Sequence, residues 1–184
     1  HALTTELAVG FKDFVSPDAP DIYPEELRAD IDALNVIIYA DFNLAVNLAA
    51  LVTNQKDYEY YYDRIFARLD WLEERLSKQR YLMGDTITDS DIRIFPTLAR
   101  FDLVFYQKYL VNKKRLVDYP NLWNYAKDLY SNPAFGGTTD FDSMRKRFYY
   151  VDHTPFEDLP RLVPKGPDDS IWLEPNDRAE KFGK

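Results

Sequence analysis

The sequence contains no cysteine and only two histidines, His1 and His153, among its 184 residues. Without cysteine the chain cannot form a disulfide, a thiolate metal site or a thiol nucleophile. A histidine with no cysteine or acidic partner does not indicate a catalytic triad, so we expect His153 to be structural or exposed. The acidic stretch 89–91 lacks a third cluster of ligands nearby, and we expect no metal site.

Basic residues are also few in comparison with acidic ones. The chain has 23 Lys and Arg against 31 Asp and Glu, a formal charge of −8. An acidic surface repels phosphate, so we expect neither nucleic acid nor an anionic membrane as a partner. We identify no apolar run long enough to span a bilayer and no signal peptide, and we expect a cytoplasmic protein. The chain starts at His1 rather than Met, which is consistent with a processed product, an expression product or a piece of a longer protein.

No segment alternates between apolar and polar residues for long enough to indicate a sheet, and the sequence predicts an all-α fold. Apolar residues instead recur at steps of three and four. The expected helices cover 3–11, 24–51 with a kink, 56–78, 89–109 with a kink at Pro96, 120–131 and 140–150. We expect residues 1–22 to be a lead-in and linker, 23–151 to form one helical domain, and 152–184 to be an extended tail packed on the body.

The most informative stretch surrounds Thr88. Thr88 occupies an N-cap position and Asp91 stands three residues later, which is the acidic form of the capping box. Ile87 and Ile92 occupy the positions of the hydrophobic staple, and Gly84 supplies a turn before the helix. The residues that follow are apolar around much of the helix, so we expect a buried helix whose cap, Thr88 and Asp91, is structural.

This arrangement resembles the N-capping motif of the C-terminal domain of glutathione transferases. A narrower resemblance, to the glutathionyl-hydroquinone reductases or Xi class, extends from about residue 21 to 167. The matching segments are Asp21-Ile22-Tyr23-Pro24-Glu25-Glu26-Leu27-Arg28, Leu72-Glu73-Glu74-Arg75-Leu76, Gln79-Arg80-Tyr81-Leu82, Arg100-Phe101-Asp102, Asp118-Tyr119-Pro120-Asn121-Leu122-Trp123 and Val163-Pro164-Lys165-Gly166-Pro167.

The resemblance implies a helical bundle that follows an N-terminal thioredoxin-like domain, in an enzyme that is expected to be a homodimer. In that family a cysteine thiolate of the N-terminal domain takes glutathione from a quinol-type substrate, and a second glutathione regenerates the thiolate. Glutathione would be bound mainly by that absent domain. We therefore expect no catalytic residue in this chain, and no activity from the chain alone.

The resemblance also implies that side chains of the helical domain line one side of the substrate-binding site. The family pattern matches at Asn43, while its tyrosine is replaced here by Asn47; its later Tyr-Tyr pair is kept as Tyr149 and Tyr150. Asn47 either bonds a smaller or different ligand or satisfies a helix carbonyl. The two tyrosines either contact substrate or only pack at a helix end. The alternative function, in a different class, is a non-enzymatic binding or dimerisation module with the same fold.

Overall fold

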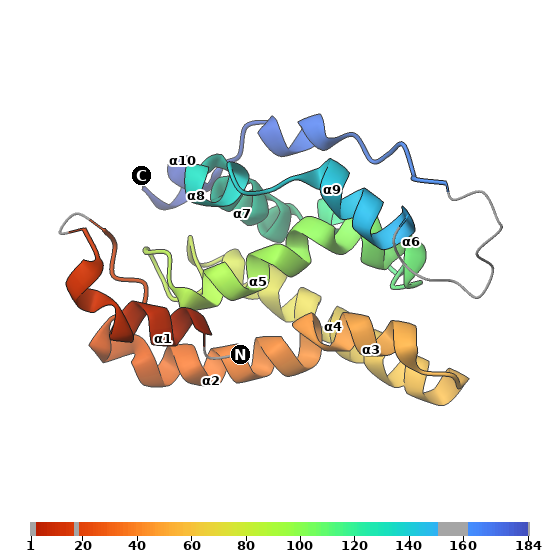
Figure 1. Cartoon of the computed structure of the whole chain (residues 1–184), viewed down its shortest axis with the longest axis horizontal. Coiled ribbons are helices and arrows are strands. Elements are labelled where there is room, and N and C mark those ends of the chain that lie inside the picture. Colours follow the sequence, from red (N-terminus) through yellow and green to blue (C-terminus); the bar gives the residue numbers. More distant parts are fainter. Residues whose placement is uncertain (1–2, 17–18, 151–161, 184) are drawn as a thin grey trace.

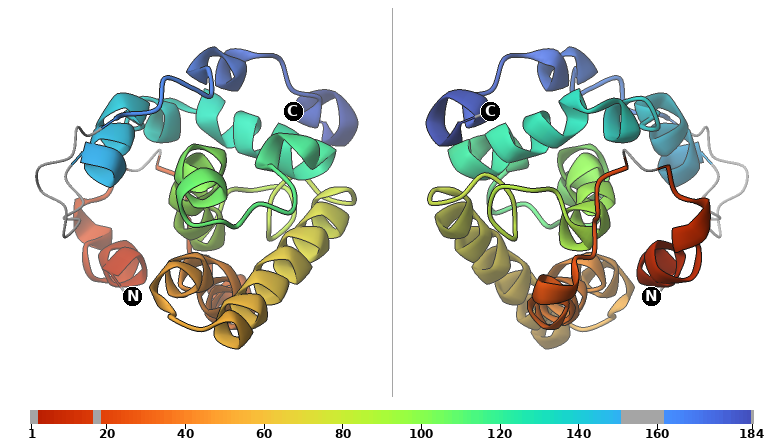
Figure 2. Two further views of the ribbon diagram at one scale, coloured as in Figure 1. Left: turned by 90° about the vertical axis from the view of Figure 1, so that its right-hand side faces the viewer. Right: turned by 90° about the vertical axis from the view of Figure 1, so that its left-hand side faces the viewer.

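The computed structural model describes residues 3–16, 19–150 and 162–183, except for the side chains of Lys12 and Tyr150. Within these ranges the fold is all helical, with no strand, which confirms the predicted fold class. Figures 1 and 2 show the helices gathered around α5 (Asp89–Arg100), which lies at the centre of the bundle. His153 lies outside the described residues.

The first half of the chain forms one long, interrupted helix that pairs with a second. A 3-10 turn (Glu25–Leu27) leads into α2 (Arg28–Ile38), a π-helical turn (Tyr39–Asn43) and α3 (Ala45–Leu51), and α4 (Gln55–Leu76) returns along α3; a short α1 (Leu3–Gly10) precedes them. We expected Pro24 at the first helical position, but it is the N-cap residue and has an extended backbone. The expected kink is the π-helical turn, which adds one residue to the helical repeat.

The second half continues from the capped helix. After α5 come a π-helical turn (Phe101–Phe105), α6 (Tyr106–Lys108), α7 (Pro120–Ser131), α8 (Pro133–Gly136), α9 (Phe141–Arg145) and another π-helical turn (Lys146–Tyr150). The α-helix passes through Pro96 and changes to the π-helical turn only at Phe101. Asn132 and Pro133 were expected only to end a helix. They also begin α8, because the Asn132 side chain accepts a hydrogen bond from the Ala134 N–H at 3.0 Å.

The core surrounds α5 on most sides. The buried apolar side chains of α5 and the turn after it include Ile94, Phe95, Leu98, Phe101, Leu103 and Val104. They pack against Leu34, Ile38 and Phe42 from the first helix, Ile65, Phe66, Leu69 and Leu72 from α4, and Leu122, Tyr125 and Leu129 from α7. The central position of α5 agrees with its mainly apolar sequence.

The described part of the tail, 162–183, is not uniformly extended as we expected. It contains a 3-10 turn (Asp169–Leu173) and α10 (Arg178–Phe182). Asp168 caps the first turn by accepting a hydrogen bond from the Ser170 N–H at 3.0 Å. Trp172 is buried from this turn against the rings of Phe95 and Trp123, so the tail contributes to the core.

One segment departs from the expectation that no apolar run could span a bilayer. Among the described residues, the helical stretch 25–51 is long enough to cross a bilayer. It also contains an 18-residue window that is apolar enough to do so, with a mean hydropathy of 1.5. Core helices of globular proteins and signal sequences pass the same test. In this fold Ile31, Ile38 and Phe42 of the stretch are buried in the core.

Candidate functional site

Thr88 and Asp91 form the capping box at the start of α5. One carboxylate oxygen of Asp91 accepts hydrogen bonds from the Thr88 N–H at 2.8 Å and the Thr88 hydroxyl at 3.0 Å. The other accepts from the Leu82 N–H at 3.0 Å and the Tyr125 hydroxyl at 2.6 Å. Asp91 is fully buried. Burial raises the pKa of Asp91, and the hydrogen bonds from its donors act in the opposite direction.

The cap therefore joins three parts of the fold rather than one helix end. The sequence pattern did not reveal Tyr125, because that residue lies 34 positions away on α7. Gly84 has a φ of 111°, a backbone conformation that favours glycine, and it pairs with Tyr81 through two main-chain hydrogen bonds. These contacts are satisfied within the protein, which is consistent with a structural role.

Asn43 and Asn47 lie next to each other around the π-helical turn that precedes α3. The Asn43 amide donates to the Arg93 carbonyl of α5 at 3.1 Å, and its own amide oxygen is buried without a partner among the described residues. The Asn47 N–H donates to the Leu44 carbonyl, and its side chain donates to the Asn43 carbonyl at 2.9 Å. Asn47 thus satisfies a helix carbonyl where the regular helical repeat is interrupted.

Tyr149 lies on the π-helical turn after α9, half-buried against the end of α5. Its hydroxyl donates to the Leu103 carbonyl at 3.1 Å, and the Lys108 ammonium lies 5.6 Å from its ring centroid. Burial raises the pKa of Tyr149, so the phenol keeps its proton near neutral pH. The backbone of Tyr150 belongs to the same turn, but its side chain lies outside the described residues.

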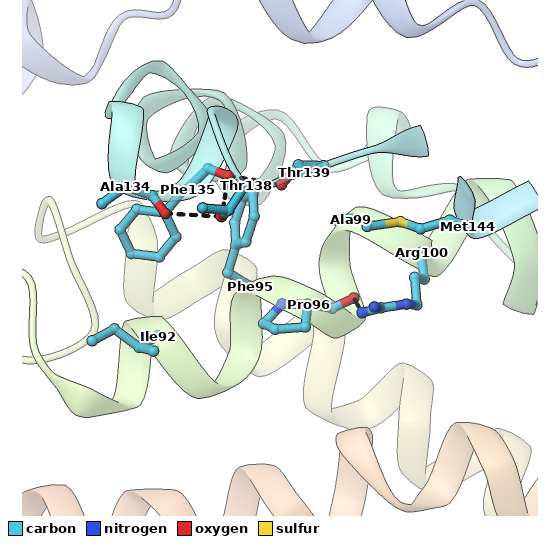
Figure 3. A pocket seen from close by; sticks show the side chains of 10 residues that line it. All are labelled: Ile92, Phe95, Pro96, Ala99, Arg100, Ala134, Phe135, Thr138, Thr139 and Met144. Atoms are coloured by element: carbon cyan, nitrogen blue, oxygen red, sulfur yellow. Dashed lines mark hydrogen bonds between the residues drawn. The ribbon is translucent and has the colours of Figure 1, made fainter. Parts of the chain in front are cut away.

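A cavity of about 300 Å³ opens beside the middle of α5 (Figure 3). Its walls come from one side of α5, from α8 and the loop after it, and from α9. The lining residues are Ile92, Phe95, Pro96, Ala99, Arg100, Ala134, Phe135, Thr138, Thr139 and Met144. Ile92, Pro96 and Arg100 follow each other at four-residue steps, so they lie on one side of the helix.

The predicted site residues meet the same helix at different points. Asn43 contacts α5 at Arg93, next to the lining residue Ile92, and Tyr149 contacts the chain at Leu103, three residues beyond Arg100. Among the described residues, neither asparagine side chain hydrogen bonds to Tyr149. The candidates therefore contact α5 and the turn after it at separate points, and they form no single hydrogen-bonded cluster.

None of the ten lining residues was predicted as substrate-binding from the sequence, and Arg100 is the charged one among them. It was noted only as part of a matching motif, although a basic residue in the four-residue repeat with Ile92 and Pro96 is visible in the sequence. Its guanidinium donates to the Pro96 carbonyl at 2.6 Å, and burial lowers the pKa of Arg100. In the described ranges no acidic side chain pairs with it.

The described residues contain no group of three or more His, Asp or Glu side chains placed to hold a metal ion. The chemistry that this site can supply is an apolar wall, one cation and one phenol.

Comparison with known proteins identifies the domain. Residues 55–128 match the family model for the glutathione S-transferase C-terminal domain. The chain is 38% identical over 147 residues to glutathionyl-hydroquinone reductase PcpF of Sphingobium chlorophenolicum, covering 80% of this chain and 46% of PcpF. It is 34% identical over 171 residues to glutathionyl-hydroquinone reductase YqjG of Escherichia coli, covering 93% of this chain and 51% of YqjG.

Solved structures give the same result. A glutathione transferase of Gordonia bronchialis superposes with a TM-score of 0.91 at 42% identity, covering 99% of this chain and 56% of that one. The Xi transferase of Phanerochaete chrysosporium superposes with a TM-score of 0.79 at 36% identity, covering 88% of this chain and 52% of that one. The chain spans about half the length of the curated relatives it matches. The chain is thus similar to the glutathione S-transferase C-terminal domain through residues 55–128, and along most of its length to glutathionyl-hydroquinone reductases and Xi-class transferases.

Proposed function

We propose that this chain is the substrate-side domain of an enzyme that reduces glutathionyl-hydroquinones with glutathione. The observation that carries the proposal is the apolar cavity beside α5. Tyr149 does not line this cavity, but its hydroxyl bonds the Leu103 carbonyl, three residues after the lining residue Arg100. Relatives that are named glutathionyl-hydroquinone reductases support the choice of reaction. The cytoplasmic location and the homodimer expected from the sequence belong to the same proposal.

In the proposed reaction, a cysteine thiolate from an N-terminal thioredoxin-like domain attacks the sulfur of the glutathionyl-hydroquinone. A proton first moves from a ring hydroxyl to the sulfur-bearing carbon, which gives a ketone tautomer. As the carbon–sulfur bond then breaks, its electron pair moves into the ring and charge develops on the ring oxygen, which takes a proton to give the hydroquinone. The enzyme is left as a mixed disulfide with glutathione. A second glutathione thiolate attacks this disulfide, which frees the enzyme thiolate and releases glutathione disulfide.

In this reaction the role of the chain is to bind the hydroquinone ring. The apolar lining excludes water from the ring, and the Tyr149 phenol would donate to a ring oxygen on which charge develops as the bond breaks. The Tyr149 hydroxyl now donates to the Leu103 carbonyl at 3.1 Å, which is long for an O–H···O hydrogen bond. Breaking this hydrogen bond to form one with the substrate should therefore cost little free energy.

A non-enzymatic binding or dimerisation module is the second candidate. It is favoured by Asn47, whose side chain replaces the family tyrosine and bonds a carbonyl of its own helix rather than pointing a free donor at a ligand. Such a module would keep the fold and need no cysteine.

The coding sequence upstream of His1 distinguishes the two candidates. The reductase proposal expects a thioredoxin-like domain with a cysteine there, followed in frame by this chain. Intact-mass measurement of the protein purified from its source would confirm that both parts belong to one polypeptide. A natural protein that contains this chain but no such domain would favour the binding module.

A further inference from the structure

Arg100 is a cation in an otherwise apolar cavity. It is the charged one of the ten lining residues, and seven of the others are apolar: Ile92, Phe95, Pro96, Ala99, Ala134, Phe135 and Met144. Its position at the end of α5 places the guanidinium along the cavity wall, pointing back to Pro96 (Figure 3). The cavity thus combines an apolar surface with a positive group at one edge.

The charge of Arg100 is poorly compensated by the described protein. A guanidinium has five N–H donors in a planar fork. One of them is used, by the Pro96 carbonyl, and in the described ranges no carboxylate contacts the others. Arg100 is only partly buried and its hydrogen bond to the Pro96 carbonyl is exposed, and this partial burial lowers the pKa of Arg100. A ligand carboxylate would supply the missing counter-charge and could accept two parallel hydrogen bonds from the fork.

The two hydroxyls in the lining do not compete for this role. The Thr138 hydroxyl lies 2.9 Å from the Ala134 carbonyl and 3.0 Å from the Phe135 carbonyl, and the Thr139 hydroxyl donates to the Phe135 carbonyl at 2.8 Å. Their protons are used within the loop, so the lining offers a carboxylate one set of free donors, at Arg100. The Thr oxygens remain as acceptors only.

We propose that this cavity binds an aromatic ring that carries a carboxylate, with the carboxylate on Arg100 and the ring against Phe95, Phe135 and Met144. A volume of about 300 Å³ is at the lower end for small-molecule sites and suits one ring or a fused pair. The biological meaning rests on the proposed function: the substrate quinol would be one that bears an acid group. The binding itself requires no turnover.

Two methionines make the site directly observable. Met144 lines the cavity, whereas Met83 lies near Arg75, away from it. With 13C-methyl methionine in the chain, titration with 2-naphthoate should shift the Met144 methyl signal and leave the Met83 signal in place. The neutral isostere 2-naphthamide should bind about tenfold more weakly or worse, since a hydrogen bond to a charged group is worth more than a neutral one.

Arg100→Gln should abolish the preference for naphthoate over naphthamide. Binding of the naphthalene ring should still shift the Met144 methyl signal. Arg100→Lys, which keeps the charge but loses the fork, should retain part of the preference. The matched control is Lys146→Gln, which removes a positive charge from the turn that directly follows α9, the helix of Met144. Lys146 is paired with Asp142 at 2.5 Å. It should leave the preference unchanged. Circular dichroism should show the same helical signal for all three variants.

Equal affinity for naphthoate and naphthamide, no shift at Met144, or an undiminished preference in Arg100→Gln would each overturn the proposal. The outcome is separate from that of the reductase proposal. Turnover of uncharged quinol conjugates without naphthoate binding would defeat this inference alone, whereas binding without any turnover would defeat only the proposed reaction.

Discussion

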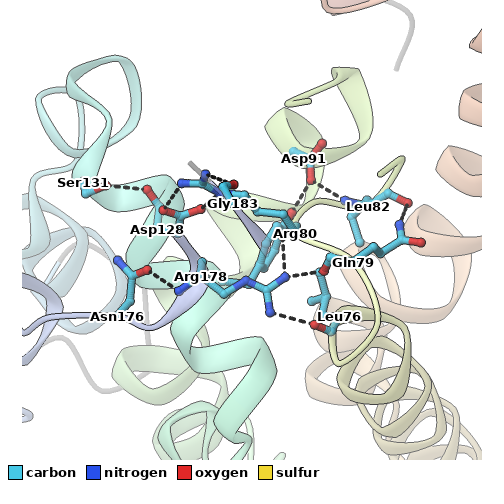
Figure 4. Close-up of polar contacts among 11 residues, drawn as sticks. Leu76, Gln79, Arg80, Leu82, Asp91, Asp128, Ser131, Asn176, Arg178 and Gly183 are labelled. Carbon is cyan, nitrogen blue, oxygen red and sulfur yellow. Dashed lines mark hydrogen bonds and ion pairs between the residues drawn. The ribbon is translucent and has the colours of Figure 1, made fainter. Parts of the chain in front are cut away.

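The guanidinium of Arg178 donates to the main-chain carbonyl of Leu76 at 2.7 Å, across 102 positions of the sequence (Figure 4). It also donates to the carbonyls of Gln79 and Arg80, and it is fully buried. The last carbonyls of a helix have no partner within the helix, and here α10 provides one for the end of α4. Burial lowers the pKa of Arg178, and the three carbonyls replace the water that burial removes.

The Arg178 contact predicts a large stability effect. Arg178→Met keeps a long apolar chain but leaves three carbonyls without their donor, at about 1–3 kcal/mol for each that water cannot reach. We expect the free energy of unfolding, measured by urea denaturation, to fall by at least about 2 kcal/mol. The control is Lys181→Met on the same helix, where the exposed ammonium contacts Asn121, and it should change stability by no more than about 0.5 kcal/mol. Equal stability of the two variants would contradict the assigned role of Arg178.

The cap of α5 gives a second prediction. Thr88→Ala removes the cap hydroxyl, which donates to Asp91. We expect the free energy of unfolding to fall by about 0.5–2 kcal/mol. Asp91→Ala should cost more, because it strands the Leu82 N–H, the Thr88 N–H and the buried Tyr125 hydroxyl. Tyr125→Phe should recover part of that loss when combined with Asp91→Ala. Denaturation curves of the two single variants that overlay the wild type would show that the cap is not stabilising.

Asp41 gives a prediction for the acid side of the stability profile. Burial raises its pKa, but hydrogen bonds from Arg64 and Arg68 on α4 outweigh this, and the pKa of Asp41 lies below its usual value of 3.8. A lowered folded-state pKa means stability that is present above about pH 4 and is lost as pH falls through the folded-state value. Asp41→Asn should therefore destabilise the protein at pH 6, and the difference from the wild type should shrink as pH falls through the lowered folded-state pKa of Asp41.

The measurement is the urea midpoint at several pH values between 2.5 and 6. Asp63→Asn, an exposed acid on α4, makes the same change in charge and serves as the control. If Asp41→Asn and Asp63→Asn have the same urea midpoint at every pH, the ion pairs between Asp41 and the two arginines do not stabilise the folded state.

Tyr149→Phe tests the proposed role of the phenol. The substitution keeps the ring beside Lys108 and removes only the hydroxyl, which donates to the Leu103 carbonyl in the fold. In a full-length enzyme, turnover of a glutathionyl-hydroquinone should fall by about tenfold or more, which corresponds to about 1.4 kcal/mol of lost transition-state stabilisation. Folding should change little. Tyr149→Phe with unchanged kinetics would assign Tyr149 to packing, and the same measurement on Tyr150→Phe would test the second tyrosine of the predicted pair.

Local patterns carried most of the fold prediction. The periodic apolar residues of α4 and the capping box before α5 depend on neighbours within one or two turns, so the sequence alone indicated them. The π-helical turns were not predicted, because each depends on a shift of one residue in hydrogen bonding that leaves no strong sequence pattern. The helix α8 was missed because Asn132 and Pro133 were interpreted only as the end of the preceding helix, although Asn132 also caps α8. The burial of Arg178 was also invisible, since its partners lie about 100 positions earlier.

The site was less predictable than the fold. Asn43, Asn47, Tyr149 and Tyr150 were selected through a family resemblance, and their roles stay predictions. The interpretation of Arg100 requires knowing that α7, α8 and α9 bring no carboxylate to it, which is a property of the packed fold. No spacing rule along one helix contains that information.

The most direct test of the account is a paired kinetic measurement. Formation of glutathione disulfide from a glutathionyl-hydroquinone and glutathione would be followed with residues 1–184 alone and with the full-length protein that contains them. The account predicts no turnover by the isolated chain, which has no cysteine, and glutathione-dependent turnover by the full-length protein. Turnover by the isolated chain, or its absence from a correctly folded full-length protein, would contradict the account.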